Sequence, residues 1–289
     1  MELRQLEYFV AVAETANFTR AAERCHVAQP SLSQSIINLE KELRQQLFDR
    51  LGRKVQLTEA GRMLFDRAKL ILSTTEDTRR ELRDFAEPAS LSVGAIPTIA
   101  PFLLPNAVKK FLELHPTTPL MLHENFTERL VESIGEGELD VGIMALPIED
   151  ERLNSKVLFR EELLLAIPKG HELTRKKHIG LKELLNVPFI LLDEMHCLGE
   201  QVMTFCRRHA YGPKVVCRGA QLSTLLSLVA IGQGVSLIPH MAITEAASET
   251  TVFRSISGEA PTRTIAAVWN RRRYRSPLID VFLNGIQTE

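Results

Sequence analysis

The chain has 289 residues, of which four are cysteine, and its 35 basic and 36 acidic side chains leave a formal net charge of −1. A chain of this length buries a large core and is expected to hold more than one domain, and its near-neutral charge gives the whole protein no bias toward nucleic acids or membranes. Four cysteines are too few for a disulfide framework, which favours a reducing compartment.

The sequence also argues against a secretion signal and a membrane span. Acidic residues stand at positions 2 and 7, where a signal peptide carries basic ones. The longest uncharged stretch lies between Arg218 and Glu245, but it contains Gly232, Gly234 and Pro239, which suit a helix, a turn and a strand. We therefore expect a cytoplasmic protein without a membrane anchor.

Residues 1–58 have the pattern of a small helical domain with a wing. Apolar residues at helical spacing predict a first helix over residues 3–13, and a short second helix follows Asn17. A third helix opens at Gln29 and Pro30, because proline at the first helical position loses no hydrogen bond. Residues 47–57 then indicate two strands joined at Gly52.

The third helix and the wing carry the candidate DNA contacts. The outer face of the helix shows short uncharged donors and acceptors that suit base edges, and the wing carries basic side chains that suit phosphates. Residues 1–58 hold eight basic and seven acidic side chains, so charge does not exclude a helical domain whose polar face is only solvated. The candidate DNA-binding residues are Gln29, Pro30, Ser31, Ser33, Gln34, Arg50, Arg53 and Lys54.

Residues 59–87 predict one long helix. Apolar or small residues recur every three or four positions from Ala60 to Phe85, close to a heptad seam. Such a helix spans roughly 40 Å, which is too long for one small domain to bury. We interpret it as a dimerisation helix rather than a solvated connector. The predicted domains are therefore residues 1–58, 59–88 and 89–289.

Residues 90–289 alternate strands with helices, which predicts an α/β domain with helices on both faces of a parallel sheet. About 200 residues of this pattern indicate two lobes with a cleft between them. Strands are expected at residues 91–95, 120–123, 139–145, 157–159, 163–167, 189–192, 214–217, 235–238 and 264–269, and helices at 101–114, 128–134, 198–208, 222–231 and 277–286.

Polar side chains follow three of these strands, at the edge where open parallel sheets bind ligands. Thr98 and Thr127 follow the first two strands, and His196 and Cys197 follow the strand at 189–192. The histidine and the N-terminus of the next helix both favour a thiolate, so we expect a lowered pKa at Cys197. A thiolate attacks a peroxide and becomes a sulfenic acid, with which a second thiol condenses.

Cys197 and Cys206 lie nine residues apart across the predicted helix 198–208. Helical geometry places their Cα atoms roughly 13 Å apart, with the side chains on opposite faces. A disulfide needs Cα atoms within about 7 Å, so a bridge requires the helix to come apart. An intact helix should therefore show both thiols free.

The residues leave other interpretations open. The threonines can be ordinary helix caps, and the cysteines can be inert core residues. Zinc is another interpretation, although the spacing of its candidate ligands matches no common site. A third interpretation is that the threonines and the helix N-termini bind a small organic anion. A fourth is that the protein is a cysteine peroxidase, although such an enzyme would need no DNA-binding segment. The candidate zinc ligands are His196, Cys197, Cys206 and His209.

The N-terminal segment resembles the LysR family of transcriptional regulators in blocks that keep the family's order and spacing, at residues 3–14, 17–22, 29–33, 39–50 and 57–61. Ala28 departs from the pattern, since the family usually has Ser or Thr there, a cap worth about 1 kcal/mol. The resemblance implies a winged helix-turn-helix that binds double-stranded DNA, a homodimer or tetramer, and contact with RNA polymerase. It implies a regulator without enzyme activity, cofactor or metal.

The C-terminal segment is similar to the peroxide-sensing OxyR branch of this family. The similarity lies in residues 96–98, 101–105 and 122–127 and in the run from His196 to Cys206. It implies that Cys197 is the peroxidatic cysteine and Cys206 the resolving one. The residues that it implies for binding peroxide or another effector are Thr98, Thr127, His196 and Glu200.

The same resemblance implies a two-lobed effector domain like a periplasmic solute-binding protein. Lobe one is then roughly residues 90–163 with 269–289, and lobe two roughly 164–268. An arginine after the last strand belongs to the family's pattern, and Arg271 is the candidate. Cys217 has no assigned role and is expected to be a buried strand residue.

Overall fold

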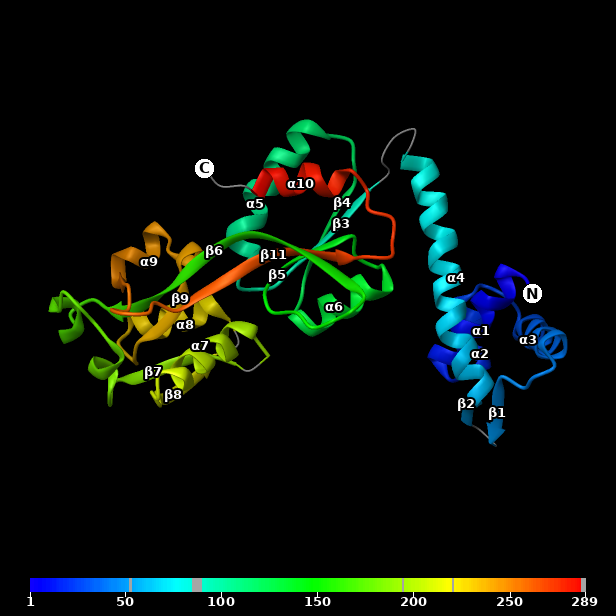
Figure 1. Cartoon of the computed structure of the whole chain (residues 1–289), viewed down its shortest axis with the longest axis horizontal. Coiled ribbons are helices and arrows are strands. Elements are labelled where there is room, and N and C mark those ends of the chain that lie inside the picture. The colour runs from blue at the N-terminus through cyan, green and yellow to red at the C-terminus, as the bar shows by residue number, and fades with distance from the viewer. Residues whose placement is uncertain (52–53, 85–89, 194, 220, 287–289) are drawn as a thin grey trace. The chain divides into compact units, whose positions relative to one another are not determined.

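A computed structural model describes residues 1–51, 54–84, 90–193, 195–219 and 221–286 of the chain. It divides into two compact units, Met1–Phe85 and Ala86–Glu289, whose helices and strands are shown in Figure 1. The first unit has one apolar core and the second has two. Within the described residues, no helix is both long and apolar enough to cross a membrane.

The N-terminal unit packs three short helices and a wing against the start of a long helix. Phe9 and Leu32 are fully buried at its core, because the apolar positions of the first and third helices repeat at helical spacing. The second helix begins where the Asn17 side chain accepts hydrogen bonds from the N–H groups of Thr19 and Arg20, at 2.8 and 3.1 Å. The elements are α1 (Leu3–Thr15), α2 (Phe18–Arg24), α3 (Gln29–Leu43), β1 (Phe48–Leu51), β2 (Lys54–Leu57) and α4 (Glu59–Asp84).

The α3 helix begins with the predicted proline but without a capping side chain. Ala28 occupies the N-cap position and makes no capping hydrogen bond, so free N–H groups of the first turn lack that partner. The wing strands β1 and β2 are antiparallel, with Phe48 opposite Leu57. The predicted wing tip at 52–53 and the predicted end of the long helix at 85–87 lie outside the described residues.

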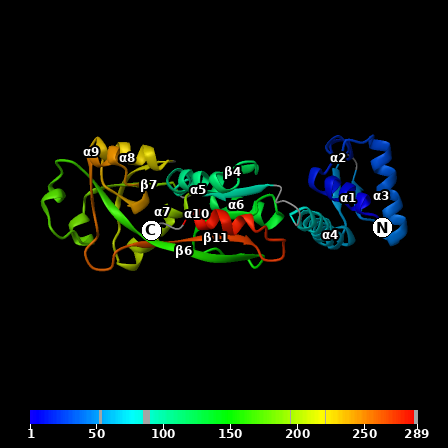
Figure 2. The same ribbon diagram turned by 90° about the horizontal axis from the view of Figure 1, so that it is seen from above.

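Lobe one of the C-terminal unit is built on a mixed sheet. Strand β3 (Leu91–Ala95) pairs in parallel with β4 and β5, and β5 pairs with β11 in the antiparallel sense. Helices α5 and α10 pack side by side on one face of the sheet and α6 covers the other (Figures 1 and 2). The elements are α5 (Ala100–Leu114), β4 (Leu120–Glu124), α6 (Thr127–Glu136), β5 (Val141–Ala145), β11 (Thr262–Asn270) and α10 (Leu278–Ile286).

Lobe two contains strands β7 and β8, which pair in parallel, and strands β9 and β10, each of which pairs in the antiparallel sense with the long strand that enters from lobe one. Helix α9 (Glu245–Thr250) and strand β10 (Thr251–Arg254) were not predicted, because elements of six and four residues are too short to show a period. The other elements are β7 (Pro188–Leu192), α7 (Cys197–Arg208), β8 (Lys214–Gly219), α8 (Leu222–Ala230) and β9 (Ser236–Pro239).

Two long strands connect the lobes. The strands predicted separately at 157–159 and 163–167 are one strand, β6 (Leu153–Pro168), which pairs with β11 in lobe one and with β9 and β10 in lobe two. Figure 1 shows β6 and β11 running together between the lobes. The sheet is therefore mixed and not purely parallel, because the chain leaves lobe one on β6 and returns in the opposite direction on β11.

The return to lobe one lies earlier in the chain than predicted. The predicted lobe two extended to residue 268, but Ile265, Ala267 and Val268 pack in the core of lobe one. These residues lie in the part of β11 that pairs with β5, so this part of the strand belongs to the sheet of lobe one. The crossing therefore lies before Ile265.

Candidate functional site

Helix α7 begins at Cys197, one residue earlier than predicted, with His196 at its N-cap. Its first turn lies directly against the end of β7. A Cβ atom at Gly199 would lie 2.7 Å from the Leu192 carbonyl oxygen, so this position accepts only glycine without a shift of the backbone. The close approach fixes where the helix starts and hence where the thiol lies.

The Cys197 thiol lies where the two lobes meet. Although α7 belongs to lobe two, the Cys197 side chain packs against the core of lobe one, and Phe102 of lobe one packs against the core of lobe two. The residues around the thiol enclose a space too small for a water molecule, which we call the thiol pocket. It is lined by Ile96, Pro97, Thr98, Phe126, Thr127, Met195, His196 and Cys197.

A buried arginine lies behind the thiol pocket. Arg263, only 2% exposed, donates from its guanidinium to Thr98 Oγ1 at 2.9 Å and to the Thr98 carbonyl oxygen at 3.1 Å. Because Thr98 Oγ1 accepts this bond, its own O–H remains free to donate. The family resemblance made Arg271 the candidate for the site's arginine, but Arg271 is exposed beyond the other end of β11. Arg263 is the arginine that acts on the thiol.

Glu161 neutralises and orients this arginine. Its Oε1 accepts from Arg263 Nε at 2.7 Å, and its Oε2 accepts from the backbone N–H of Met241 at 3.0 Å. The two charged residues are direct neighbours across the antiparallel pairing of β6 and β11. The sequence contains a signal for the pair, since each residue lies just before the apolar run of a strand that connects the lobes, but only the strand register shows that they are opposite each other.

The environment of Cys197 raises the pKa of its thiol above the ordinary value. Burial is the largest cause, because it penalises the charged form. The nearby Thr127 hydroxyl, the charge of Arg263 and the backbone N–H groups of Cys197 and Leu198 all lower the pKa, but together they do not offset burial. The predicted net lowering is therefore wrong for the closed pocket, although the stabilising groups are present.

Thr127 and His196 both line the thiol pocket. The Thr127 hydroxyl oxygen is buried and makes no hydrogen bond of ordinary geometry to the described residues, so the adjacent thiolate is the acceptor it would stabilise. His196 is 4% exposed, and its ring packs edge-on against Phe126 with centroids 4.9 Å apart. Glu200, by contrast, is exposed in the first turn of α7 and does not line the pocket.

Cys206 lies in a different environment at the other end of α7. Its side chain is fully buried in the core of lobe two, and burial raises the pKa of its thiol to about 11. All four cysteines are free, and α7 is intact over both Cys197 and Cys206, as predicted for the reduced helix. Cys217 is only partly buried on β8, so the prediction of a buried strand residue is wrong for its side chain.

Helix α7 is also held to lobe one by a hydrogen bond. Gln201, one turn after Cys197, donates from its side-chain amide to the Leu146 carbonyl oxygen at 3.1 Å. Because Leu146 follows β5 of lobe one, this bond bridges the lobes. Any unwinding of α7 must break it.

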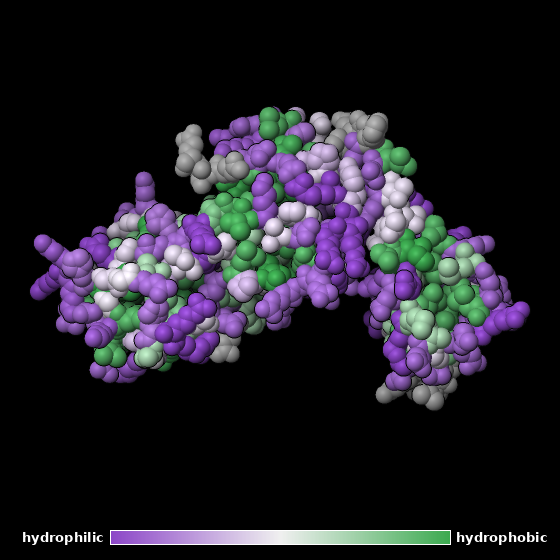
Figure 3. Space-filling view, in the orientation of Figure 1, coloured by the Kyte–Doolittle hydropathy of each residue, from purple (hydrophilic) through white to green (hydrophobic). Residues whose placement is uncertain are grey.

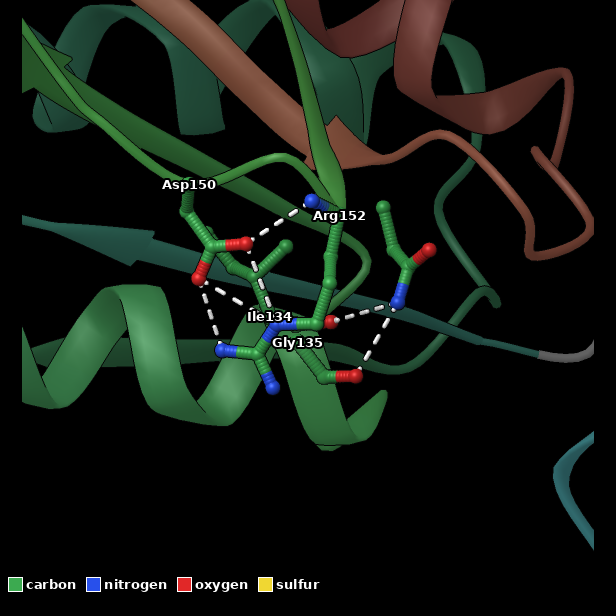
Figure 4. Close-up of polar contacts among 5 residues, drawn as sticks. Ile134, Gly135, Asp150 and Arg152 are labelled. Carbon is green, nitrogen blue, oxygen red and sulfur yellow. Dashed lines mark hydrogen bonds and ion pairs between the residues drawn. The ribbon is translucent and has the colours of Figure 1, made fainter. Parts of the chain in front are cut away.

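Helix α6, which begins at Thr127, is fixed at its far end. Asn270 donates to the carbonyl oxygens of Ile134 and Gly135, at 3.5 and 3.0 Å. Figure 4 shows the Asp150–Arg152 ion pair beside the same end of the helix, with a shortest N–O distance of 2.7 Å. These contacts hold the helix that supplies the pocket's second hydroxyl.

The zinc interpretation has no geometric support. Among the described residues, no group of three or more His, Cys, Asp or Glu side chains is placed to hold a metal ion. Cys197 and Cys206 stand on opposite faces of one helix, so they cannot share a metal while α7 is intact.

The candidate DNA-binding face lies on α3. Most of its predicted contact residues are exposed, Ser33 is half-buried, and Gln34 donates to Asn38 Oδ1 at 3.0 Å. Arg50 and Lys54 lie on β1 and β2, but their side chains, like the whole of Arg53, lie outside what the structure describes. The exposed residues of the set are Gln29, Pro30, Ser31 and Gln34.

Comparisons with known proteins place both units in one family. The family model for bacterial regulatory helix-turn-helix proteins of the LysR family matches residues 3–62, and the model for the LysR substrate-binding domain matches residues 87–289. The DNA-binding transcriptional dual regulator OxyR of Escherichia coli is 36% identical over 281 residues, which cover 96% of this chain and 91% of the relative.

Solved structures support the same family assignment. A full-length OxyR variant from Pseudomonas aeruginosa matches with a TM-score of 0.75 and 34% identity, over 99% of this chain and 94% of the other. A variant of Corynebacterium glutamicum OxyR with hydrogen peroxide bound matches with a TM-score of 0.64 and 31% identity, over 99% of this chain and 93% of the other.

Proposed function

Since this chain belongs to the LysR family of transcriptional regulators, we propose that it is a cytoplasmic regulator that binds promoter DNA and senses hydrogen peroxide through Cys197. The observation that carries the proposal is the thiol at the first turn of α7, which faces two threonine hydroxyls and a histidine and lies in the field of a buried arginine. A second thiol, Cys206, lies in the same helix. Two similar proteins support the choice of ligand: an OxyR variant with hydrogen peroxide bound, and a hydrogen peroxide-inducible genes activator of Escherichia coli.

In the proposed chemistry, the Cys197 thiolate attacks one peroxide oxygen and the O–O bond breaks. Sulfur is oxidised to the sulfenic acid, and the other oxygen leaves as hydroxide, which takes up a proton. The Thr98 hydroxyl, free to donate, and the Thr127 hydroxyl stabilise the departing oxygen. The Cys206 thiol then attacks the sulfenic sulfur, forms the disulfide and releases water.

The second step requires a large change of structure. Nine residues of helix separate the two Cα atoms by roughly 13 Å, about twice the longest disulfide span. Helix α7 must therefore unwind, Cys206 must leave the core of lobe two, and the Gln201 bond to lobe one must break. We propose that this rearrangement alters the DNA-binding units.

The pocket favours peroxide over an organic anion. The space around Cys197 does not hold even a water molecule, so a two-oxygen ligand requires a much smaller opening than a carboxylate of several atoms. Among the described pocket residues, the groups that would face the ligand are hydroxyls, an imidazole and a thiol. An anion bound at Arg263 would have to displace the ion pair with Glu161.

The proposed DNA reader works as an oligomer, with contact to RNA polymerase as part of its regulatory role. A LysR-type winged helix reads two half-sites when paired, and α4 offers a surface for pairing because it exposes large apolar residues. Figure 3 shows apolar side chains interrupting the polar surface around α4. A tetramer needs a second surface, and the edge strand β4 exposes Met121 and Leu122. The exposed residues of α4 include Met63, Leu70, Ile71 and Leu82.

Mass mapping of thiols after a brief, near-stoichiometric dose of peroxide tests the sensor. We expect Cys197 to oxidise first and a Cys197–Cys206 bridge to follow. If Cys197 stays reduced in the folded protein, the sensor proposal fails and the organic-anion regulator takes its place. If a Cys206→Ser variant still forms an intramolecular bridge through Cys217, the choice of Cys206 as partner is wrong.

Electrophoretic mobility shifts with a promoter fragment test the DNA reader. Changing Arg53 to Ala should weaken binding to all sequences and reduce its salt dependence, whereas changing Gln29 or Ser33 should reduce selectivity. Ala28→Ser, which supplies the absent cap, should stabilise α3 by about 1 kcal/mol and strengthen binding. Binding that is indifferent to Gln29, Ser33 and Arg53 would contradict the proposed groove contacts.

A further inference from the structure

The thiol pocket is closed to its own proposed substrate. The space enclosed by its lining residues is too small for a water molecule, and hydrogen peroxide has two oxygen atoms where water has one. Peroxide therefore reaches Cys197 only after a lining side chain moves. The identity of that side chain decides which oxidants reach the thiol.

Most of the lining is held in place. Ile96, Thr98 and His196 are at most 4% exposed, and Thr98 is tied at both its hydroxyl and its carbonyl oxygen by Arg263. The Phe126 ring is packed edge-on against His196. Moving any of these groups breaks buried hydrogen bonds or core packing, and each such loss is unfavourable.

Met195 is different from the rest of the lining. Its side chain is 62% exposed, and among the described residues that line the pocket it is the only one that is mostly in contact with solvent. Methionine is unbranched and has three rotatable side-chain bonds, so an exposed methionine changes rotamer on the picosecond to nanosecond scale. Among the described residues, no hydrogen bond or ring contact of the Met195 side chain has to break when it moves.

We propose that Met195 controls access to Cys197 and selects oxidants by size. Its side chain covers the solvent side of the thiol pocket, moves aside to admit hydrogen peroxide, and returns over the thiol when the pocket is empty. Hydroperoxides with a branched alkyl group need a wider opening than the methionine leaves and react more slowly. This inference rests on the proposed peroxide chemistry for the choice of ligand, but the control of access applies to any reagent that attacks the thiol.

The test compares three variants of the full-length reduced protein. Met195→Ala opens the pocket, Met195→Leu keeps the volume, and Leu185→Ala removes a large apolar side chain that is 60% exposed elsewhere in lobe two, outside the pocket. The rate of Cys197 oxidation is measured by quenched mass mapping with hydrogen peroxide and with tert-butyl hydroperoxide. The rate of Cys197 labelling is measured with methyl methanethiosulfonate and with the bulkier N-ethylmaleimide, which report access without peroxide chemistry.

We expect Met195→Ala to raise the rates with tert-butyl hydroperoxide and N-ethylmaleimide by roughly tenfold or more, the scale on which pocket volume discriminates substrates. The two small reagents should gain much less. Met195→Leu and Leu185→Ala should behave like the wild type. Equal melting temperatures of the four proteins would show that the gain comes from access and not from loosening of the lobe.

Two results would overturn the proposal. One is that Met195→Ala leaves the labelling and oxidation rates of Cys197 unchanged for both large reagents. The other is that Met195 itself gains an oxygen before Cys197 reacts, which would make it a target and not a barrier. If the labelling rates rise as expected while no variant reacts with either peroxide, access control stands and the peroxide-sensing function fails.

Discussion

The two ends of helix α7 carry the same functional group in opposite environments. Cys197 lies at the N-terminal end, between the lobes, where hydroxyls, backbone N–H groups and Arg263 face its sulfur. Cys206 lies near the C-terminal end inside the apolar core of lobe two. Burial raises the pKa of both thiols. Thr127, Arg263 and backbone N–H groups oppose this effect at Cys197, whereas at Cys206 only a backbone N–H group and the charge of Arg207 do so. The comparison shows how one intact helix keeps two thiols apart in different environments.

Removing each thiol in turn should give the largest difference between the two ends. Cys197→Ser should abolish oxidation at the site and all disulfide formation. Cys206→Ser should leave the first oxidation intact and accumulate the sulfenic acid, since no second thiol condenses with it. Dimedone trapping followed by mass spectrometry measures both outcomes, and Cys217→Ser is the matched control. Rapid sulfenic acid formation at Cys206 in the Cys197→Ser variant would contradict the contrast.

Removing the arginine should make the Cys197 end more like the Cys206 end. In Arg263→Met, Cys197 loses a positive neighbour, so its alkylation should begin at a higher pH than in the wild type. Glu161 would be left buried without its partner, which costs about 3–5 kcal/mol of folding free energy. The pH profile of labelling and urea unfolding measure the two effects. Arg271→Met, at an exposed position, should change neither.

Alkaline pH should lower the free energy of unfolding through ionisation of the buried Cys206 thiol. Its folded pKa is about 11 against an ordinary value of 9.0, so the thiol's contribution to stability is fully present below pH 9 and is lost as the pH rises toward 11. Two pKa units correspond to about 2.7 kcal/mol, and roughly 2 kcal/mol of that should be lost by pH 10.5. Urea unfolding at pH 8 and pH 10.5 tests this. Cys206→Ala should lose less than the wild type over the same interval.

Breaking the bridge between α7 and lobe one should affect only the step that unwinds the helix. Gln201→Ala removes the bond to the Leu146 carbonyl oxygen, a net loss of about 0.5–1.5 kcal/mol. We expect faster disulfide formation and an unchanged rate of the first oxidation. Stopped-flow oxidation with separate detection of the sulfenic acid resolves the two steps. A slower first step would show that Gln201 also serves the pocket.

The smallest effect is expected at Glu200. The resemblance to peroxide sensors implies that it binds ligand, but the structure leaves it exposed in the first turn of α7. There it contributes only the interaction of an acid with the helix N-terminus, about 0.3–1 kcal/mol. Glu200→Gln should therefore change the oxidation rate of Cys197 only slightly. A loss as large as that of a pocket threonine would restore Glu200 to the site.

Periodicity predicted most helices and strands of both units, because apolar spacing reports which face of an element is buried. It also predicted that Cys197 and Cys206 could not be joined while α7 is intact. Short elements such as α9 and β10 show no period, and the join of two predicted strands into β6 depends on pairing with three other strands. The ends of the predicted strands pointed to Thr98, Thr127 and His196, the resemblance assigned them a role in binding peroxide, and it misplaced the arginine.

Local chemistry, then, could be read from the order of the residues: the proline that opens α3, the missing cap at Ala28 and the two thiols of one helix. What required the folded chain was every quantity that depends on distant neighbours. Glu161 and Arg263 are 102 positions apart and meet only because β6 and β11 pair in one register. The raised pKa values of both thiols come from burial, and the thiol pocket is lined by residues of both lobes. The spacing of apolar residues along the chain cannot predict such long-range contacts, or the low dielectric of the buried sites that they form.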